Sequence, residues 1–244
     1  MHWLRDCWLA LGFLTVLPVP ATGYRPDGLG QAGRWFPAVG LLLGVLLALA
    51  YAGLAAVFPA LIAAVGLVTV WAALTGGLHL DGLADCCDGL LAPVDRERRL
   101  TIMADPRLGA FAGVGLILFL ALKIAAVSAL ASPLPALLLA PVWGRWLILL
   151  AARQPSARPG GMGDAFRSGL TPGVWLWAAA VPVALTLAVA PTWRSLAAVA
   201  AAHVVALGAI AVARHRLGGV TGDVFGLVVE LGELAILLAF AARS

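Results

Sequence analysis

Seven long apolar segments constrain the fold of this chain more than any other feature. Each is close to the roughly 20 residues that an α-helix needs to cross the hydrocarbon core of a bilayer. Of the 244 residues, 62% are hydrophobic and 11% are charged, whereas about a quarter of a soluble domain is charged. The sequence therefore predicts an all-α, polytopic membrane bundle with about seven transmembrane helices in one domain, residues 1–244. The segments are Phe36–Val57, Ala60–Leu78, Gly109–Leu130, Leu134–Ala152, Pro172–Ala190, Arg194–Ala213 and Val224–Ala242.

The N-terminus carries a shorter apolar stretch, Cys7–Leu17, which is followed by Pro18 and Pro20. Its length resembles the apolar region of a secretory signal, and a cleaved signal peptide is the alternative reading. Because Asp6 accompanies Arg5 ahead of it, we instead predict a helix that lies at the membrane interface or inserts halfway.

Two other function classes are disfavoured by the residue pattern. The net charge of +4 comes without basic runs or an aromatic platform, so no nucleic-acid partner is expected. The three cysteines, two of them the adjacent Cys86 and Cys87, match neither a disulfide framework nor a zinc spacing.

The basic residues predict how the helices are oriented. Cytoplasmic loops of membrane proteins carry an excess of Lys and Arg. With the N-terminus inside, twelve arginines fall on the cytoplasmic side and two, Arg194 and Arg243, fall outside, while Lys123 and Arg145 lie within spans. This bias predicts a multi-pass protein of the bacterial inner membrane with its C-terminus outside. The inside set is Arg5, Arg25, Arg34, Arg96, Arg98, Arg99, Arg107, Arg153, Arg158, Arg167, Arg214 and Arg216.

The acidic residues are independent of the rule that sets this orientation, and their positions agree with it. All twelve carboxylates lie at or near the cytoplasmic face, counting Glu230 and Glu233 in the first half of the last span. The predicted active site therefore faces the cytoplasm.

The stretch Thr75–Leu91, TGGLHLDGLADCCDGLL, is the richest in functional groups. Asp81, Asp85 and Asp88 share one face of a helix because they are four and then three residues apart. Such carboxylates repel one another unless a cation lies between them, and hard oxygen ligands suit Mg²⁺ or Mn²⁺ with a substrate phosphate. We therefore predict that these three aspartates bind a metal. His79 could be a base, a ligand or a polar filler.

Glycines within the same stretch, among them Gly76 and Gly77, predict broken helix geometry or close backbone approach. Irregular backbone at membrane depth is tolerated where it packs in protein or lines a wet cavity, which favours a site over a plain span.

Two further motifs carry charges. In Ile102–Phe111, Asp105 and Arg107 flank Pro106, and Arg107 is either a phosphate ligand or a membrane anchor. In the last span, Asp223, Glu230 and Glu233 form a second acidic stripe at spacings of seven and three.

Charged residues inside a membrane span are costly and therefore suggest function. The partners expected for Glu230 and Glu233 are the metal or the intramembrane cations Lys123 and Arg145, for which a structural buried pair is the alternative.

These motifs resemble the cobalamin synthase (adenosylcobinamide-GDP ribazoletransferase) family over nearly the whole chain. The resemblance begins at FLTVLPVP and RWFPAVGLLLG, peaks at TGGLHLDGLADCCDGL, continues through IMADPRLGAFA and Lys123, and closes at TGDVFGLVVELGEL. It departs from the family pattern at Pro106 and in the Gly160–Leu170 loop.

The resemblance implies a Mg²⁺-dependent transferase. Its substrates would be adenosylcobinamide-GDP and α-ribazole or its 5′-phosphate, and its products adenosylcobalamin or its 5′-phosphate and GMP. It implies Asp81, Asp85 and His79 as catalytic, and Asp81, Asp85 and Asp88 as metal ligands. It also implies membrane lipid as surroundings and leaves open a homo-oligomer or association with other late-pathway enzymes. The residues expected to bind substrate are Asp105, Arg107, Lys123, Arg145, Asp223, Glu230 and Glu233.

Three alternatives are weaker. A CDP-alcohol phosphotransferase would need an Arg that the Asp81–Asp85 stretch lacks, and the second acidic stripe only loosely imitates a prenyltransferase motif. A transporter would be expected to show an internal inverted repeat, which the sequence does not display.

Overall fold

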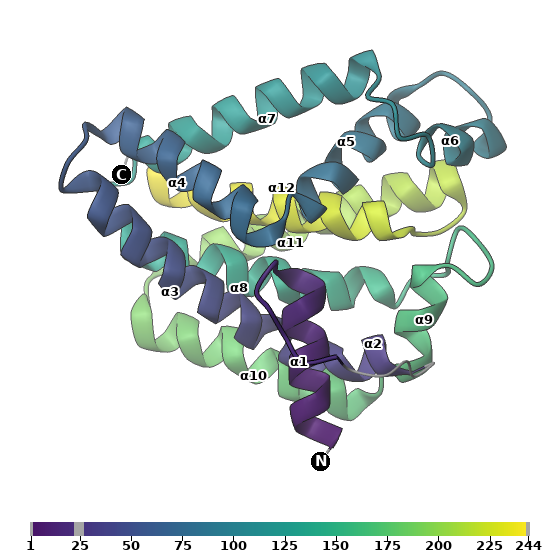
Figure 1. Ribbon diagram of the computed structural model, residues 1–244, viewed down its shortest axis with the longest axis horizontal. Coiled ribbons are helices and arrows are strands. Elements are labelled where there is room, and N and C mark those ends of the chain that lie inside the picture. The colour runs from purple at the N-terminus through teal and green to yellow at the C-terminus, as the bar shows by residue number, and fades with distance from the viewer. Residues whose placement is uncertain (1, 22–26, 243–244) are drawn as a thin grey trace.

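Long antiparallel helices make up most of the protein (Figure 1). The computed structural model describes residues 2–21 and 27–242, so Arg25 and Arg243 of the orientation argument lie outside the described residues. Six helices there are long and apolar enough to cross a membrane, and their bounds agree with the predicted segments to within a few residues. The fold class is thereby confirmed. The six are α3 (Phe36–Ala55), α7 (Ala110–Ser128), α8 (Pro133–Ala152), α10 (Pro172–Val189), α11 (Trp193–Leu217) and α12 (Gly222–Ala241).

The remaining predicted span, Ala60–Leu78, is not one straight helix. Helix α4 (Ala60–Thr75) ends at a turn, and α5 (Leu78–Leu91) continues at an angle of 93° to it. Gly76 and Gly77 form the turn with φ of 61° and 71°, a left-handed conformation that glycine adopts without steric cost. The glycines thus break the helix as predicted, and the protein has seven passes when α4 and α5 are counted as one broken span.

Helices α8 and α12 form the centre of the bundle. In their most apolar stretches 78% and 67% of the residues are buried, against 22% to 28% for the other four long helices. Small residues permit close packing of helices in a membrane. At Gly40 of α3 a Cβ would lie 2.5 Å from the Pro141 carbonyl oxygen of α8, so only glycine allows this approach.

Short elements surround one end of the bundle (Figure 1). Helices α6 (Arg96–Ile102) and α9 (Met162–Gly169) lie where α5 and α11 end and where α12 begins. Helix α1 (His2–Leu14), with 13 residues, is too short to span and runs across the long helices. The predicted short N-terminal helix is present, and it is followed by α2 (Gly28–Ala32) and the 3₁₀ helix η1 (Gly33–Trp35).

Two glycine contacts bring α5 against the start of α12. A Cβ at Gly82 would lie 2.7 Å from the Asp223 carbonyl oxygen, and one at Gly226 would lie 2.9 Å from the His79 carbonyl oxygen. The end of α5 is held against α6, because Arg99 of α6 donates hydrogen bonds of 2.9 Å to the Gly89 and Leu90 carbonyls. The acidic face of α5 is therefore held beside the first turn of α12.

Candidate active site

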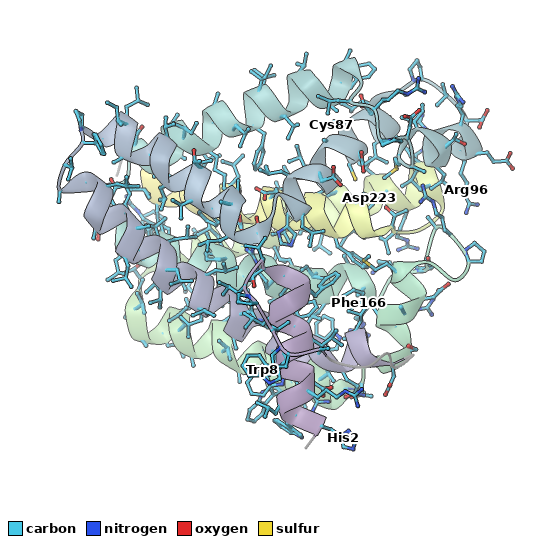
Figure 2. The ribbon with its side chains drawn as sticks, viewed as in Figure 1. His2, Trp8, Cys87, Arg96, Phe166 and Asp223 are labelled. Atoms are coloured by element: carbon cyan, nitrogen blue, oxygen red, sulfur yellow. The ribbon has the colours of Figure 1, made fainter. Side chains whose placement is uncertain are left out.

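Carboxylates from α5 and α12 gather where these helices meet. Asp81 is exposed, while Asp85 and Asp223 are half-buried. Asp85 is close enough to Asp223, Asp81 and Asp88 for their charges to repel it. Asp223 belongs to the first turn of α12, where it accepts a 3.1 Å hydrogen bond from the Thr221 hydroxyl (Figure 2). The structure thus adds Asp223 to the predicted Asp81 and Asp85.

Asp88, the third predicted metal ligand, makes a different contact. Its carboxylate accepts hydrogen bonds from the backbone N–H groups of Gly109 (2.7 Å) and Ala112 (2.9 Å). These are orphan donors at the start of α7, where a negative charge is favourable. Across residues 2–21 and 27–242, no three His, Cys, Asp or Glu side chains are grouped so that they could hold a metal ion. Asp88 therefore caps a neighbouring helix, and its binding of a metal together with Asp81 and Asp85 stays a prediction.

A pair of substitutions tests the capping role of Asp88. Asp88→Ala should lower the free energy of unfolding by about 0.5–2 kcal/mol, the usual range for a lost cap. Asp88→Asn should lose less, because its amide oxygen can still accept from Gly109. Thermal unfolding in detergent measures both, and Asp95→Ala at the start of α6, where Asp95 accepts from the Arg98 N–H, is the matched cap control. Equal stability of Asp88→Ala and the unaltered protein would contradict the capping role.

Arg158 belongs to this site, although the sequence distinguishes it only as one of the twelve arginines predicted to be cytoplasmic. Its positive charge acts on both Asp85 and Asp223, and its guanidinium donates to the Leu100 carbonyl oxygen. A backbone bridge between Ser156 and Val220 holds the Arg158 loop beside α12. No local motif marks Arg158, because residues 58 or more positions away create its surroundings.

Two hollows adjoin Asp81, which is part of the wall of each. We call the first the inner cavity; it has a volume of about 80 Å³ and includes His79, Asp81 and Asp223 in its wall. We call the second the side groove; it has about 670 Å³ and passes between α1, the turn from α4 to α5, and α7. Phe13 and Leu78 also line both. The apolar wall of the inner cavity further includes Ile148, Met162 and Phe225, and that of the side groove includes Leu80, Leu108, Leu116 and Leu120.

His79 lines the inner cavity and is 3% exposed. Its Nδ1 atom has no hydrogen-bond partner within the described part of the chain. A buried polar atom is normally paired, so an unpaired one calls for an explanation such as a bound group. His203 differs in this respect, since its Nδ1 lies 2.7 Å from the Val199 carbonyl oxygen, and the role of His79 stays a prediction.

Asp105 and Arg107 lie further out, beside the start of α7. They form a salt bridge of 2.6 Å in which the Arg107 side chain is 86% exposed. Hydrogen bonds from Arg107 lower the pKa of the Asp105 carboxyl to about 2, so the pair stays charged at neutral pH. With Asp88 they line a shallow surface groove, so an anion could reach Arg107 there.

The other predicted substrate ligands form a separate buried network. Lys123 donates to Glu230 at 2.7 Å and to Glu233 at 2.8 Å, and Arg145 donates to the other oxygen of Glu233. The four side chains are at most 4% exposed. Glu230 lies seven residues, or roughly 10 Å, along α12 from Asp223. The second acidic stripe therefore divides between the site and these cations, the partners that were expected.

The fold and the site together define a class, a multi-pass helical membrane protein with a carboxylate-lined site at one end of its bundle. A family model described as cobalamin-5-phosphate synthase matches residues 6–241. The chain belongs to this family. No solved structure matches it significantly.

Named relatives cover almost the whole chain. A Pseudomonas fluorescens protein named adenosylcobinamide-GDP ribazoletransferase is 45% identical over 241 residues, which cover 96% of this chain and 98% of the relative. Proteins of the same name from Syntrophobacter fumaroxidans and Roseiflexus are 41% and 37% identical, and the matches cover 95% and 93% of this chain. The phosphotransferase, prenyltransferase and transporter alternatives are not favoured by these likenesses.

Proposed function

We propose that this protein joins adenosylcobinamide-GDP to α-ribazole or its 5′-phosphate, releasing GMP and adenosylcobalamin or its 5′-phosphate. The observation that carries the proposal is the position of Asp81 between the inner cavity and the side groove, with Asp85, Asp223 and Arg158 beside it. A transfer between two substrates needs two adjoining spaces that meet at the reacting groups. The names of the relatives supply the two substrates.

The reaction is a displacement at phosphorus. A ribose hydroxyl of ribazole attacks the phosphorus nearer the cobinamide, an oxygen–phosphorus bond forms, and the pyrophosphate bond to GMP breaks. Asp81 lines both hollows, so its carboxylate is placed to accept the hydroxyl proton. Arg158 can offset negative charge that develops on the phosphate oxygens. The side groove, which is the larger and mostly apolar, suits the bulky corrinoid.

The metal requirement belongs to this proposal. Mg²⁺ is commonly bound through one or two carboxylates together with substrate phosphates, rather than in a preformed protein cage. Asp85 and Asp223, which lie close together and have Asp81 as a neighbour, fit that mode without Asp88. They would hold Mg²⁺, which when bound neutralises charge on the pyrophosphate.

We also propose an orientation of the protein in the membrane. The long helices alternate in direction, so the ends that carry Arg96, Arg153 and Arg214 are at the end of the bundle where the carboxylates gather. The positive-inside rule favours this end as cytoplasmic. The site would then face the cytoplasm from a bacterial inner membrane. Self-association, or association with other enzymes of the late pathway, stays a prediction from the resemblance.

The decisive experiment uses the purified protein in lipid with both substrates. We expect GMP and adenosylcobalamin to form in equal amounts in Mg²⁺, to stop forming when EDTA removes the metal, and to resume when Mg²⁺ returns. Turnover unaffected by EDTA would contradict the metal proposal alone. No product at any Mg²⁺ concentration, together with movement of a corrinoid across sealed vesicles, would overturn the transferase proposal.

A further inference from the structure

We infer that the inner cavity binds the benzimidazole ring of ribazole, with the His79 imidazole donating a hydrogen bond to the free ring nitrogen of that base. The inference rests on the proposed function and assigns each of its two substrates to a separate hollow. His79 is then a substrate-binding residue, rather than the base that removes the hydroxyl proton.

The walls of the inner cavity suit a small flat aromatic group. Phe13 and Phe225 line it, and their rings pack against Phe166 of α9 with centroids 5.8 and 5.3 Å apart (Figure 2). Ile148 and Met162 add apolar surface. A single water needs roughly 10–15 Å³ of such space, so about 80 Å³ admits a group of several atoms. A corrin ring with its amide side chains is far too large for it.

Hydrogen-bonding capacity distinguishes the base of ribazole from the guanine of the other substrate. A benzimidazole attached to ribose presents one free ring nitrogen, which accepts one hydrogen bond. An imidazole side chain can supply the matching N–H donor, and His79 is part of the wall of the inner cavity. Guanine presents several donors and acceptors, most of which would be unpaired against these apolar walls at considerable cost.

The order of residues along the cavity also orients the ribose. His79 is buried, whereas Asp223 is half-buried and Asp81 is exposed. When the base is bound at His79, its ribose therefore lies toward Asp223 and Asp81. Since Asp81 also lines the side groove, the attacking hydroxyl and the phosphorus would meet beside it.

The test compares two nucleosides and three proteins. The nucleosides are α-ribazole and its indole analogue, in which C–H replaces the free ring nitrogen. For the unaltered protein we expect kcat/KM to be about tenfold lower with the analogue, the order of effect for one lost buried hydrogen bond. His79→Phe should lower kcat/KM for α-ribazole by a similar factor and abolish the difference between the nucleosides. His79→Gln retains an N–H donor and should restore part of that difference.

Two controls make the result specific. In His79→Phe the KM for adenosylcobinamide-GDP should stay unchanged, because that substrate occupies the other hollow. His203→Gln alters the histidine on α11 that packs beside Trp143 and Trp146, and should leave both nucleoside constants unchanged.

The outcomes separate the inference from the proposed function. Equal use of α-ribazole and its indole analogue by the unaltered protein would overturn the inference while leaving the transferase proposal intact, and this comparison needs no variant to fold. A rise in KM for adenosylcobinamide-GDP alone in His79→Phe would overturn it as well. Failure of the unaltered protein to use α-ribazole would overturn both.

Discussion

Replacing Asp81 or Asp85 by Asn is expected to reduce turnover by about 100- to 1,000-fold, the usual cost of removing one group that stabilises charge in a transition state. Asparagine keeps the shape of the side chain but loses the charge needed to accept a proton or hold Mg²⁺. Stability should not fall, because Asp85 is repelled by Asp81, Asp88 and Asp223, and neutralising one member relieves that repulsion.

The measurement is the initial rate of GMP release with both substrates saturating, beside size-exclusion chromatography and thermal unfolding in detergent. Glu97→Gln, an exposed acid on α6, is the matched control and should retain the rate of the unaltered protein. Retention of most activity in both Asp81→Asn and Asp85→Asn would refute the assigned site. Loss of folded protein would instead show that these carboxylates are structural.

The second large effect is expected in the buried charge network. Glu233 accepts from Lys123 and Arg145 and is 0% exposed. Glu233→Met should lower the free energy of unfolding by about 3–5 kcal/mol, because removing one partner leaves a buried charge uncompensated. The lost charge would affect Arg145 more than Lys123. Its Nε and Nη2 atoms already have no hydrogen-bond partner in the described part of the chain, whereas Lys123 keeps Glu230 and lies 4.1 Å from the Trp71 ring centroid.

A double substitution tests whether the charge pair is responsible. Arg145→Met combined with Glu233→Met removes both charges, so it should be more stable than the sum of the single losses predicts. Unfolding in detergent by heat or denaturant measures the three variants. Asp105→Asn breaks the exposed pair with Arg107 and should change stability little, since exposed ion pairs contribute little. Additive losses, or a Glu233→Met variant as stable as the unaltered protein, would contradict the prediction.

Much of the fold could be predicted because lipid imposes a simple rule on the chain. Every backbone N–H and C=O must be satisfied inside the hydrocarbon, so each apolar stretch of sufficient length becomes a helix. The bounds of α3, α8 and α12 follow from hydrophobicity alone to within a few residues. The break at Gly76 and Gly77 was predictable as well, although its angle of 93° depends on packing.

The sequence predicted the residues of the candidate site better than it predicted the contacts between them. Spacing identified Asp81, Asp85 and Asp88 as one helix face. In the structure Asp88 also caps the start of α7, which begins about twenty residues later. The stripe of Asp223, Glu230 and Glu233 was identified too, and it divides between two surroundings. Arg158 carried no local signal.

The sequence by itself therefore determined the helices, the all-α membrane class, the acidic face of α5 and the family, because these depend on periodicity, composition and local motifs. Only the tertiary structure decided which charges meet. The contacts of Gly82 and Gly226 bring α12 against α5 and place Asp223 beside Asp85. The contact of Gly144 with the Glu233 side chain brings α12 against α8, where Arg145 lies. Such pairings depend on distances between side chains far apart in the chain, and helical spacing contains no information about those distances.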